Sequence, residues 1–351
     1  MIAVFRVDAS TQIGSGHVMR CLTLAQKLKK EKKAKVYFVM RLLDGNLIDL
    51  VKSKGFTVFT LPKAPLNDEL KGYAKWLTVT QMQDAEETNA VISQLPKIDL
   101  LVVDSYAIDC EWENMLRQYV KQIMVIDDLA NRKHDCDILL DQNYSYNMHN
   151  KYDELVPKTC QKYIGPQYLL LREEFYKTKK HLKKRDGSIK NILVFFGGSD
   201  LTNETKKAME AIKLLNKPEI KVNVVVGASN KNKEQIKEIC SSDEQFTFYC
   251  QVENMAELMN EADLAIGAGG TTTWERCFME LPSIVISIAD NQHAGCKFIA
   301  ENTKVISYLG KSSDVDAVTL GQAVSSISKD EYFLMIDKMK KIFGGIEFEN
   351  R

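Results

Sequence analysis

Residues 2–30, IAVFRVDASTQIGSGHVMRCLTLAQKLKK, place an apolar run, a glycine-containing turn and an amphipathic segment one after another. The run IAVFRV (2–7) is rich in Val, Ile and Phe and lacks the polar alternation of a half-exposed strand, so it predicts a buried parallel strand. From His17 to Lys30 the apolar residues recur at helical spacing, which predicts a helix with one apolar stripe. The chain therefore begins with a strand, a turn and a helix, a pattern typical of α/β folds.

This alternation continues along the chain in two halves. Residues 314–343 have the spacing of two helices. Ligands of doubly wound sheets bind beyond the carboxyl ends of the strands, so the residues just after each strand are candidates for a site. The pattern predicts an α/β protein with two Rossmann-like domains and a cleft between them. The further apolar runs that predict strands are 35–40, 56–61, 98–104 and 122–127 in the first half, and 191–196, 220–226, 246–250, 263–268, 282–288 and 304–309 in the second.

A basic run, KTKKHLKKR (177–185), followed by Asp-Gly-Ser, separates the two halves. A block of like charge beside turn-forming residues is typical of a solvated helix end and a linker. We therefore expect an N-terminal domain over residues 1–180, a C-terminal domain over residues 186–330 and a C-terminal helix over residues 331–351.

The composition of the chain excludes several classes of function. Lys and Arg together number 47, as do Asp and Glu, so the net charge is zero and offers no long-range attraction to nucleic acid or to an anionic membrane. The N-terminus lacks the pattern of a signal peptide, and the longest apolar runs fall far short of the roughly 20 residues that span a bilayer. None of the eight cysteines stands in a C-x-x-C pair. We expect a cytoplasmic protein with reduced cysteines that binds neither nucleic acid nor membrane.

The turn after the first strand carries the first candidate site. Gly14 and Gly16 allow a ligand to approach the backbone closely, and the start of the following helix offers unpaired N–H groups to an anion. His17 lies in the first helical turn, where the helix dipole favours the neutral imidazole that a general base requires. An incidental polar residue at a helix start is an equally good interpretation of His17. Asp8, Ser10 and Arg20 are the candidates to orient His17 or the substrate.

Two turns in the second half could bind phosphate groups. The first, FFGGSD (195–200), follows a strand and precedes a helix expected to begin at Thr202, but a Gly-Gly turn alone is a weak signal. The second, IGAGGTTTWE (266–275), places three glycines and three threonines at a helix start. Its backbone amides and hydroxyls can bind phosphate oxygens, and Glu275, one turn into the helix, can accept both hydroxyls of a ribose.

A D-x-D sequence, Asp135-Cys136-Asp137, matches the form that binds a divalent metal in some nucleotide-sugar transferases. It precedes a strand, ILLDQN (138–143), in the half that lacks the proposed phosphate-binding turns. His134 and Asp135, with Asp127 and Asp128, are a second candidate metal cluster, but they lack regular ligand spacing. We therefore interpret these residues as structural and expect no metal and no cofactor.

Several longer motifs resemble one known family, the UDP-2,4-diacetamido-2,4,6-trideoxy-β-L-altropyranose hydrolases of pseudaminic acid biosynthesis. These motifs are DASxxIGSGHxxRCLTLA (8–25), VVDSY (102–106), IDDLANRxHDCDILLDQN (126–143) and GPQYLLLREEF (165–175). The second half, with GGSD, NMAELMNEADLAIGAGGTTTWE (254–275) and Asn291-Gln292, is similar to the nucleotide half of the MurG-type transferases. Both families have the two-domain GT-B fold.

The resemblance implies a reaction and a role for individual residues. Water activated by His17 would attack the anomeric carbon, and UDP would depart with inversion and without a metal. The first domain would bind the sugar and the second UDP, with uracil near Asn254 and Met255 and the ribose on Glu275. The remaining residues implied for the sugar are Asp8, Gly14, Gly16, Arg20, Tyr106 and Asn143, and those implied for the nucleotide are Gly198, Ser199, Gly269, Gly270, Thr271 and Gln292.

Three alternative functions remain open at this point. A MurG-like transferase would use the same UDP site but pass the sugar to an acceptor alcohol, although the first half offers no obvious apolar loop for membrane attachment. A non-catalytic UDP-sugar-binding protein would give His17 no role. A related hydrolase could act on a different nucleotide sugar. The sequence does not determine the oligomeric state.

Overall fold

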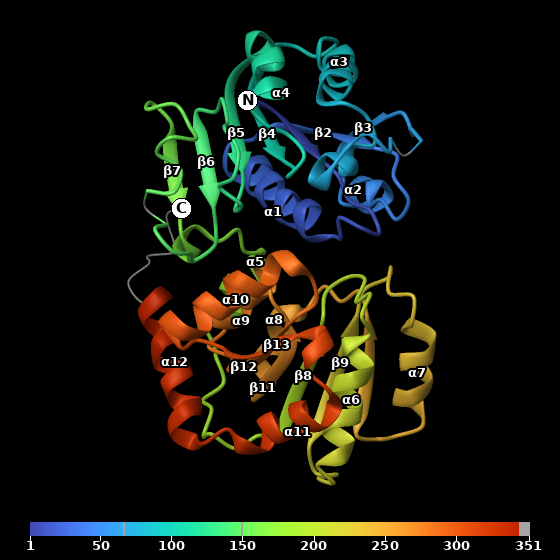
Figure 1. The fold of residues 1–351 in the computed structure, drawn as a ribbon, viewed down its shortest axis with the longest axis vertical. Helices are drawn as coiled ribbons and strands as arrows, with labels where there is room; N and C mark the ends of the chain where they lie inside the picture. The colour runs from blue at the N-terminus through green and yellow to red at the C-terminus, as the bar shows by residue number, and fades with distance from the viewer. Residues whose placement is uncertain (66, 149, 344–351) are drawn as a thin grey trace. The chain divides into compact units, whose positions relative to one another are not determined.

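The computed structural model describes residues 1–65, 67–148 and 150–343. The chain forms two compact units (Figure 1). The first unit comprises residues 1–143 and 147–170, and the second comprises residues 144–146 and the chain from Leu171 onward. The last eight residues of the helix expected over 331–351 lie outside the described residues.

The first unit is a parallel sheet with helices on both faces. Its strand order, β3-β2-β1-β4-β5-β6-β7, contains the 3-2-1-4-5-6 order of a Rossmann sheet, and all of its strand pairs are parallel. The strands are β1 (Ile2–Val7), β2 (Lys35–Arg41), β3 (Thr57–Leu61), β4 (Ile98–Asp104), β5 (Val120–Ile126), β6 (Ile138–Asp141) and β7 (Gln161–Ile164). The helices are α1 (Gly16–Glu31), α2 (Ile48–Ser53), α3 (Gln81–Ile92) and α4 (Cys110–Leu116).

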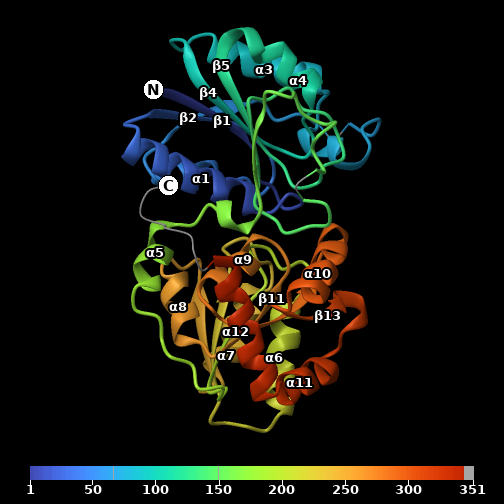
Figure 2. The same ribbon diagram turned by 90° about the vertical axis from the view of Figure 1, so that its left-hand side faces the viewer.

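Two apolar clusters lie on opposite faces of this sheet. Phe5 of β1 packs with Val18 and Leu22 of α1, whereas Val4 belongs to the cluster that contains Trp112 of α4. Figure 2 shows α1 on one side of the strands and α3 and α4 on the other. Because consecutive strand residues point to opposite faces and both faces are covered, the strands are continuous apolar runs.

The second unit has the same architecture. Its strand order, β10-β9-β8-β11-β12-β13, is again 3-2-1-4-5-6, with parallel pairing throughout. The strands are β8 (Asn191–Phe195), β9 (Lys221–Val226), β10 (Phe246–Cys250), β11 (Leu264–Ala268), β12 (Ser283–Ser287) and β13 (Ser307–Lys311). The helices are α5 (Glu173–Lys179), α6 (Glu204–Leu214), α7 (Lys233–Ser241), α8 (Met255–Glu261), α9 (Thr271–Phe278), α10 (Asp290–Thr303), α11 (Ala317–Ser326) and α12 (Lys329–Phe343).

The predicted strands are confirmed, with ends that move by at most a few residues. The two helices expected over 314–343 are also confirmed, as α11 and α12. Strand β7 was not expected. Its first three residues, Gln161 to Tyr163, are exposed and not apolar, because β7 is the edge of the sheet.

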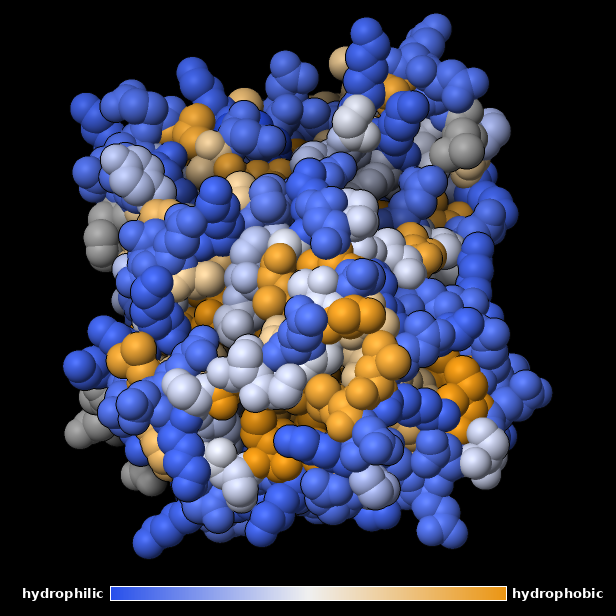
Figure 3. Space-filling view, turned by 60° about the horizontal axis from the view of Figure 1, so that its bottom comes forward, coloured by the Kyte–Doolittle hydropathy of each residue, from blue (hydrophilic) through white to orange (hydrophobic). Residues whose placement is uncertain are grey.

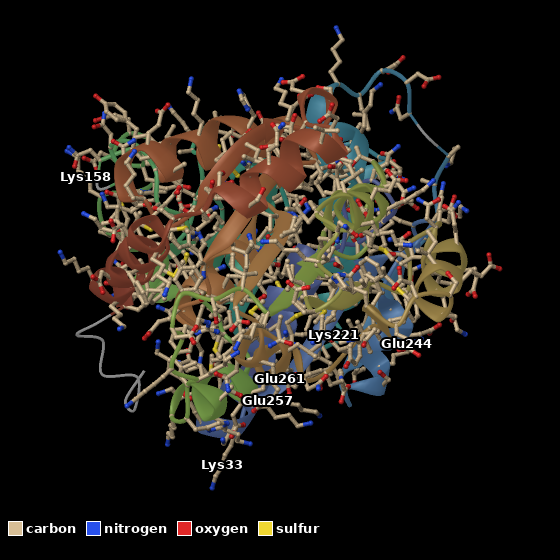
Figure 4. The ribbon with its side chains drawn as sticks, turned by 90° about the horizontal axis from the view of Figure 1, so that it is seen from below. Lys33, Lys158, Lys221, Glu244, Glu257 and Glu261 are labelled. Carbon is tan, nitrogen blue, oxygen red and sulfur yellow. The ribbon has the colours of Figure 1, made fainter. Side chains whose placement is uncertain are left out.

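The basic run 177–185 contains the end of α5 and is largely exposed, as predicted, but several of its side chains also bind the second unit. Lys179 donates from Nζ to the Phe278 carbonyl at 2.6 Å. Lys183 donates to Asp263 at 2.6 Å, and Arg185 donates to the Ala262 carbonyl at 3.0 Å. Figure 4 labels Glu257 and Glu261 of α8, which also bind this segment through Thr178 and Lys183. The positive charges therefore stabilise the start of the second unit.

In the described part of the chain, no helix combines the length and apolar character needed to cross a membrane. On the face drawn in Figure 3, hydrophilic residues predominate and apolar residues lie between them.

Candidate active site

The candidate base lies at the point of the first sheet where the strand order reverses. Strands β1 and β4 are neighbours there, and the chain leaves them in opposite directions along the sheet. The turn after β1 leads into α1, which begins at Gly16 and places His17 in its first turn. Asp104 is the last residue of β4. Nδ1 of His17 lies 2.6 Å from Oδ1 of Asp104, and both side chains are buried.

Arg20 completes this arrangement. It lies three residues after His17, so both project from the same face of α1. Its Nε and Nη2 donate to the two oxygens of Asp104, each at 2.6 Å. Burial alone would raise the pKa of Asp104, but the charge of Arg20 and the hydrogen bonds from Arg20 and His17 outweigh burial and lower it. Asp104 is therefore a carboxylate at neutral pH.

The ionised Asp104 determines which nitrogen of His17 can act as a base. A carboxylate only accepts hydrogen bonds, so Nδ1 must donate to it. Nη2 of Arg20 also lies 3.2 Å from Nδ1. We assign the proton to Nδ1 nevertheless, because the carboxylate is closer and Arg20 has its own bonds to Asp104. Neutral His17 then carries its lone pair on Nε2, the atom that can accept a proton.

Asp128 gathers three of the residues predicted to bind the sugar. It accepts from Oη of Tyr106 at 2.6 Å and from Nδ2 of Asn143 at 2.9 Å. Arg20 lies 3.6 Å from it. Burial, followed by the charge of Asp128, raises the pKa of Tyr106. The phenol therefore stays protonated and can accept a hydrogen bond from a ligand while it donates to Asp128.

Three aromatic side chains, Tyr73, Trp76 and Tyr106, form an aromatic wall beside His17. The rings of Tyr106 and Trp76 meet the imidazole edge-on, with centroids 4.7 Å and 6.0 Å away. Tyr73 lies 4.8 Å from Trp76 and 5.1 Å from Tyr106. Tyr73 and Trp76 come from a 3₁₀ helix (Gly72–Leu77) that was not expected from the sequence. Its surroundings are polar and aperiodic, so no pattern indicated that these rings reach His17.

Asp8 has partners away from His17. It accepts from the backbone N–H of Arg41 at 2.7 Å and pairs with Arg6 at 2.7 Å. Burial raises its pKa against the opposing charge of Arg6. These contacts stabilise the end of β1, and its predicted role toward the sugar stays a prediction.

Gly14 and Gly16 differ in what they contribute. Gly14 has a φ of +80° and donates its N–H to the Ser10 carbonyl, so the turn requires glycine there. A Cβ on Gly16 would meet nothing within 4 Å, so the start of α1 is open to a ligand.

The predicted phosphate turns lie at the corresponding point of the second sheet. Strands β8 and β11 are neighbours, and the turns that follow them contain FFGGSD and IGAGGTTTWE. Gly198 accepts from Ser229 at 2.9 Å, and a Cβ on Gly227 would lie only 2.2 Å from its carbonyl oxygen. The helix expected at Thr202 begins at Glu204, because Asp200 accepts the N–H groups of Glu204 and Thr205. Gly198 and Ser199 therefore form a turn before the helix.

The turn after β11 leads directly into α9. Gly270, with a φ of +132°, precedes the first helical residue, Thr271. A Cβ on Gly269 would lie 2.1 Å from Sγ of Cys296 and 3.6 Å from Cβ of Gln292. The structure thus brings Gly269, Gly270, Thr271 and Gln292 together, with the backbone of Gly269 closely packed against α10.

Glu275 lies one turn into α9. Its side chain is 16% exposed, and its contact with Arg172 is long, at 4.0 Å. Burial raises the pKa of Glu275, although Arg172 opposes this effect. A partly exposed carboxylate in this position can accept hydrogen bonds from a ligand. Asn254 and Met255, exposed and buried respectively, stand at the start of α8, and their predicted contact with uracil stays a prediction.

The D-x-D residues are engaged in protein contacts. Arg117 binds Asp135 at 2.8 Å and Asp137 at 2.5 Å. His134 lies 2.7 Å from Glu113, with both side chains buried. These contacts support the structural interpretation of this segment.

Comparison with solved structures decides the fold. The crystal structure of Acinetobacter baumannii MurG superposes with a TM-score of 0.59 at 16% identity, covering 97% of this chain and 94% of MurG. Residues 192–341 match the C-terminal domain of glycosyltransferase family 28. The chain has the GT-B fold. The predicted architecture is thereby confirmed.

Two relatives in sequence extend over most of this GT-B chain. The UDP-2,4-diacetamido-2,4,6-trideoxy-beta-L-altropyranose hydrolase of Campylobacter jejuni is 26% identical over 309 residues, which cover 88% of this chain and 99% of that protein. The uncharacterized protein MJ1062 of Methanocaldococcus jannaschii is 29% identical over 290 residues, 80% of this chain. The match spans about half of MJ1062, 54% of its length. The resemblance inferred from the motifs is confirmed.

Proposed function

We propose that the protein hydrolyses UDP-2,4-diacetamido-2,4,6-trideoxy-β-L-altropyranose to UDP and the free sugar. The observation that carries this proposal is the buried contact between His17 and Asp104, which leaves Nε2 of His17 as the base. The similarity to the Campylobacter hydrolase supports the choice of sugar. The proposal assigns the UDP portion to the second unit and the activation of water to the first.

The reaction is a single displacement. Nε2 of His17 accepts a proton from water as the water oxygen bonds to the anomeric carbon. The bond from that carbon to the diphosphate oxygen breaks, its electron pair leaves on UDP, and the anomeric configuration inverts. Asp104 stabilises the imidazolium that forms. We propose that backbone N–H groups at the start of α9 stabilise the departing diphosphate, so that neither a metal nor a cofactor takes part.

The aromatic wall of Tyr73, Trp76 and Tyr106 favours a deoxygenated, acetamido-bearing sugar as the substrate. A C6 methyl group and acetamido methyl groups are apolar, and aromatic rings bind apolar groups well. Tyr106 and Asn143, both held by Asp128, can bond the polar groups of the same sugar. The proposal includes a small-molecule substrate, a cytoplasmic location, and no nucleic-acid or membrane partner.

The direct test is an incubation with this UDP-sugar in excess EDTA, followed by NMR of the first product formed. We expect the free sugar to appear first as the inverted anomer, together with stoichiometric UDP. Initial retention of configuration would overturn the single displacement. Turnover that stops in EDTA and returns with added divalent metal would overturn the metal-independent mechanism.

A MurG-like transferase is the second candidate, because residues 192–341 match a glycosyltransferase domain. The same incubation separates the two functions. A hydrolase cleaves the UDP-sugar and releases UDP without an acceptor alcohol. A transferase also binds UDP, but it cleaves the UDP-sugar only when an acceptor is added. UDP binding with no turnover under either condition would identify a non-catalytic binding protein.

Glu275→Ala is expected to weaken UDP binding by about 1–3 kcal/mol, roughly 5- to 150-fold, because a charged hydrogen bond to the ribose is lost. Isothermal titration calorimetry with UDP measures this change. Glu174→Ala is the matched control, since Glu174 also pairs with Arg172, but its other oxygen accepts a hydrogen bond from the backbone N–H of Ala256 in α8. A 2′,3′-dideoxy analogue of UDP should bind wild type and Glu275→Ala alike. Unchanged UDP affinity in Glu275→Ala would rule out the ribose contact.

A further inference from the structure

Arg276 is a buried cation at the base of the turn after β11. Its side chain is 2% exposed. Nη2 donates to the Ala268 carbonyl at 3.0 Å and to Oγ1 of Thr273 at 3.1 Å. Ala268 is the last residue of β11, and Thr273 lies in the first turn of α9. The guanidinium therefore reaches back toward the beginning of its own helix and joins the two residues, Ala268 and Thr273, that flank the turn.

Gly267 leaves room for this guanidinium. A Cβ on Gly267 would lie 2.8 Å from Nη1 of Arg276 and 2.5 Å from the Phe195 carbonyl oxygen. Gly267 and Phe195 are paired residues of β11 and β8. The charge thus lies at the carboxyl ends of the two strands whose turns contain FFGGSD and IGAGGTTTWE.

The charge of Arg276 is not balanced inside the protein. Among the described residues, no carboxylate lies within ion-pair distance of its guanidinium, and its Nε is buried without a hydrogen-bond partner. Its ionisable neighbours are Glu275, Cys277 and Cys296. Burial raises the pKa of both thiols, so they are neutral at pH 7. Glu275 has its contact with Arg172 instead.

A buried charge without a partner is costly, and hydrogen bonds to a carbonyl and a hydroxyl do not need a full positive charge. Burial accordingly lowers the pKa of Arg276. An anion at the start of α9 would balance the charge, and the helix dipole there attracts an anion as well. The charge of Arg276 and the helix dipole therefore both favour an anion at the start of α9.

We propose that Arg276 is the positive charge that attracts the diphosphate of UDP to the turn Gly269–Thr271 and stabilises it as the leaving group. This inference rests on the proposed function, which supplies the diphosphate. Arg276 acts through the turn at whose base it lies and is a positioning residue. Its side chain both shapes the turn, through Ala268 and Thr273, and adds a positive potential that the backbone amides alone do not supply.

The test compares the binding of UDP and uridine to wild type and to Arg276→Met, Arg276→Gln and Arg276→Lys by calorimetry. We expect Arg276→Met and Arg276→Gln to bind UDP about 10- to 100-fold more weakly and uridine less than about 3-fold more weakly, since uridine lacks the diphosphate. Arg276→Lys should retain most of the affinity for UDP. Arg276→Gln can still donate a hydrogen bond to the Ala268 carbonyl, so the comparison can be made with this variant if Arg276→Met does not fold.

Arg185→Met is the matched control. Arg185 is another largely buried arginine of the second unit, and it also donates to backbone carbonyls, at Met259 and Ala262. We expect its loss to lower the melting temperature without changing the ratio of the two affinities. Equal weakening of UDP and uridine in Arg276→Gln, or no weakening of either, would overturn the inference. Failure of wild type to bind UDP at all would instead overturn the proposed function.

Discussion

We expect His17→Ala to lower kcat by about 10²- to 10⁴-fold, because water must then attack the anomeric carbon with no general base to accept its proton. UDP affinity should change little, since His17 belongs to the first unit and the proposed nucleotide residues belong to the second. Initial rates of UDP release, measured with the UDP-sugar at saturation, give kcat, and calorimetry gives the dissociation constant of UDP.

Two further measurements make the role of His17 specific. Added imidazole should restore part of the rate of His17→Ala, because it can enter the space left by the side chain and accept the proton. His293→Ala is the control, since His293 contacts Tyr308 in the second unit and has no place in the proposed proton transfer. Full activity in a folded His17→Ala protein would exclude His17 as the base.

Asp104→Asn is expected to lower kcat by a similar factor, about 10²- to 10⁴-fold, although the side chain keeps its shape. A carboxylate can only accept from Nδ1 of His17, whereas an amide can also donate to it. Donation would move the imidazole proton to Nε2 and remove the base. The amide would also leave the buried charge of Arg20 without its partner. Steady-state kinetics over a range of pH measures kcat of the variant and of wild type.

The lowered pKa of Asp104 predicts that this carboxylate does not limit catalysis near neutral pH. Since Arg20 and His17 outweigh burial and hold the pKa of Asp104 below its ordinary value of 3.8, this carboxylate is ionised throughout the range from pH 4 upward. Its contribution to folding is present above the unfolded pKa and is lost only as pH falls through the lower folded value. Protonation of Asp104 should therefore cause no loss of kcat/KM in wild type at any pH above 4.

Asp99→Asn is the matched control for Asp104→Asn. Asp99 also lies on β4, but it is partly exposed and pairs with Lys121 at the other end of the strand. We expect Asp99→Asn to keep the wild-type kcat and pH profile. If Asp104→Asn keeps them as well, Asp104 does not orient the imidazole.

Local pattern was enough to predict the layers of both units. Strands such as β1 and β11 lie between covering helices, so their residues are apolar on both faces and stand out as continuous runs. Edge strand β7 escaped prediction because its exposed side chains have no reason to be apolar. The contacts of the basic run 177–185 were not predicted for a related reason. Its fixed partners, here Asp263 and the carbonyls of Ala262 and Phe278, come from distant parts of the chain.

The candidate site divides in the same way. Gly14, His17 and Glu275 could be predicted as site residues from the sequence. Each lies in or beside a turn between a strand and a helix, where the neighbouring residues are those next to it in the chain. Asp104 is the third residue of the motif VVDSY (102–106), but nothing local to it indicated a partner 87 residues away. Trp76 gave no signal in its polar segment.

The alternation of strands and helices, the glycine-containing turns after β1, β8 and β11, and the imidazole at the start of α1 follow from the sequence alone. Each of them depends on residues that are close together in the chain. The tertiary structure alone decided that Asp104 holds His17 and that aromatic rings lie beside it. It alone decided that Arg276 lies unbalanced at the base of the turn after β11. The physical reason is that orientation, burial and charge balance depend on which strands become neighbours in each sheet, and the 3-2-1-4-5-6 order places side by side strands that are distant in sequence.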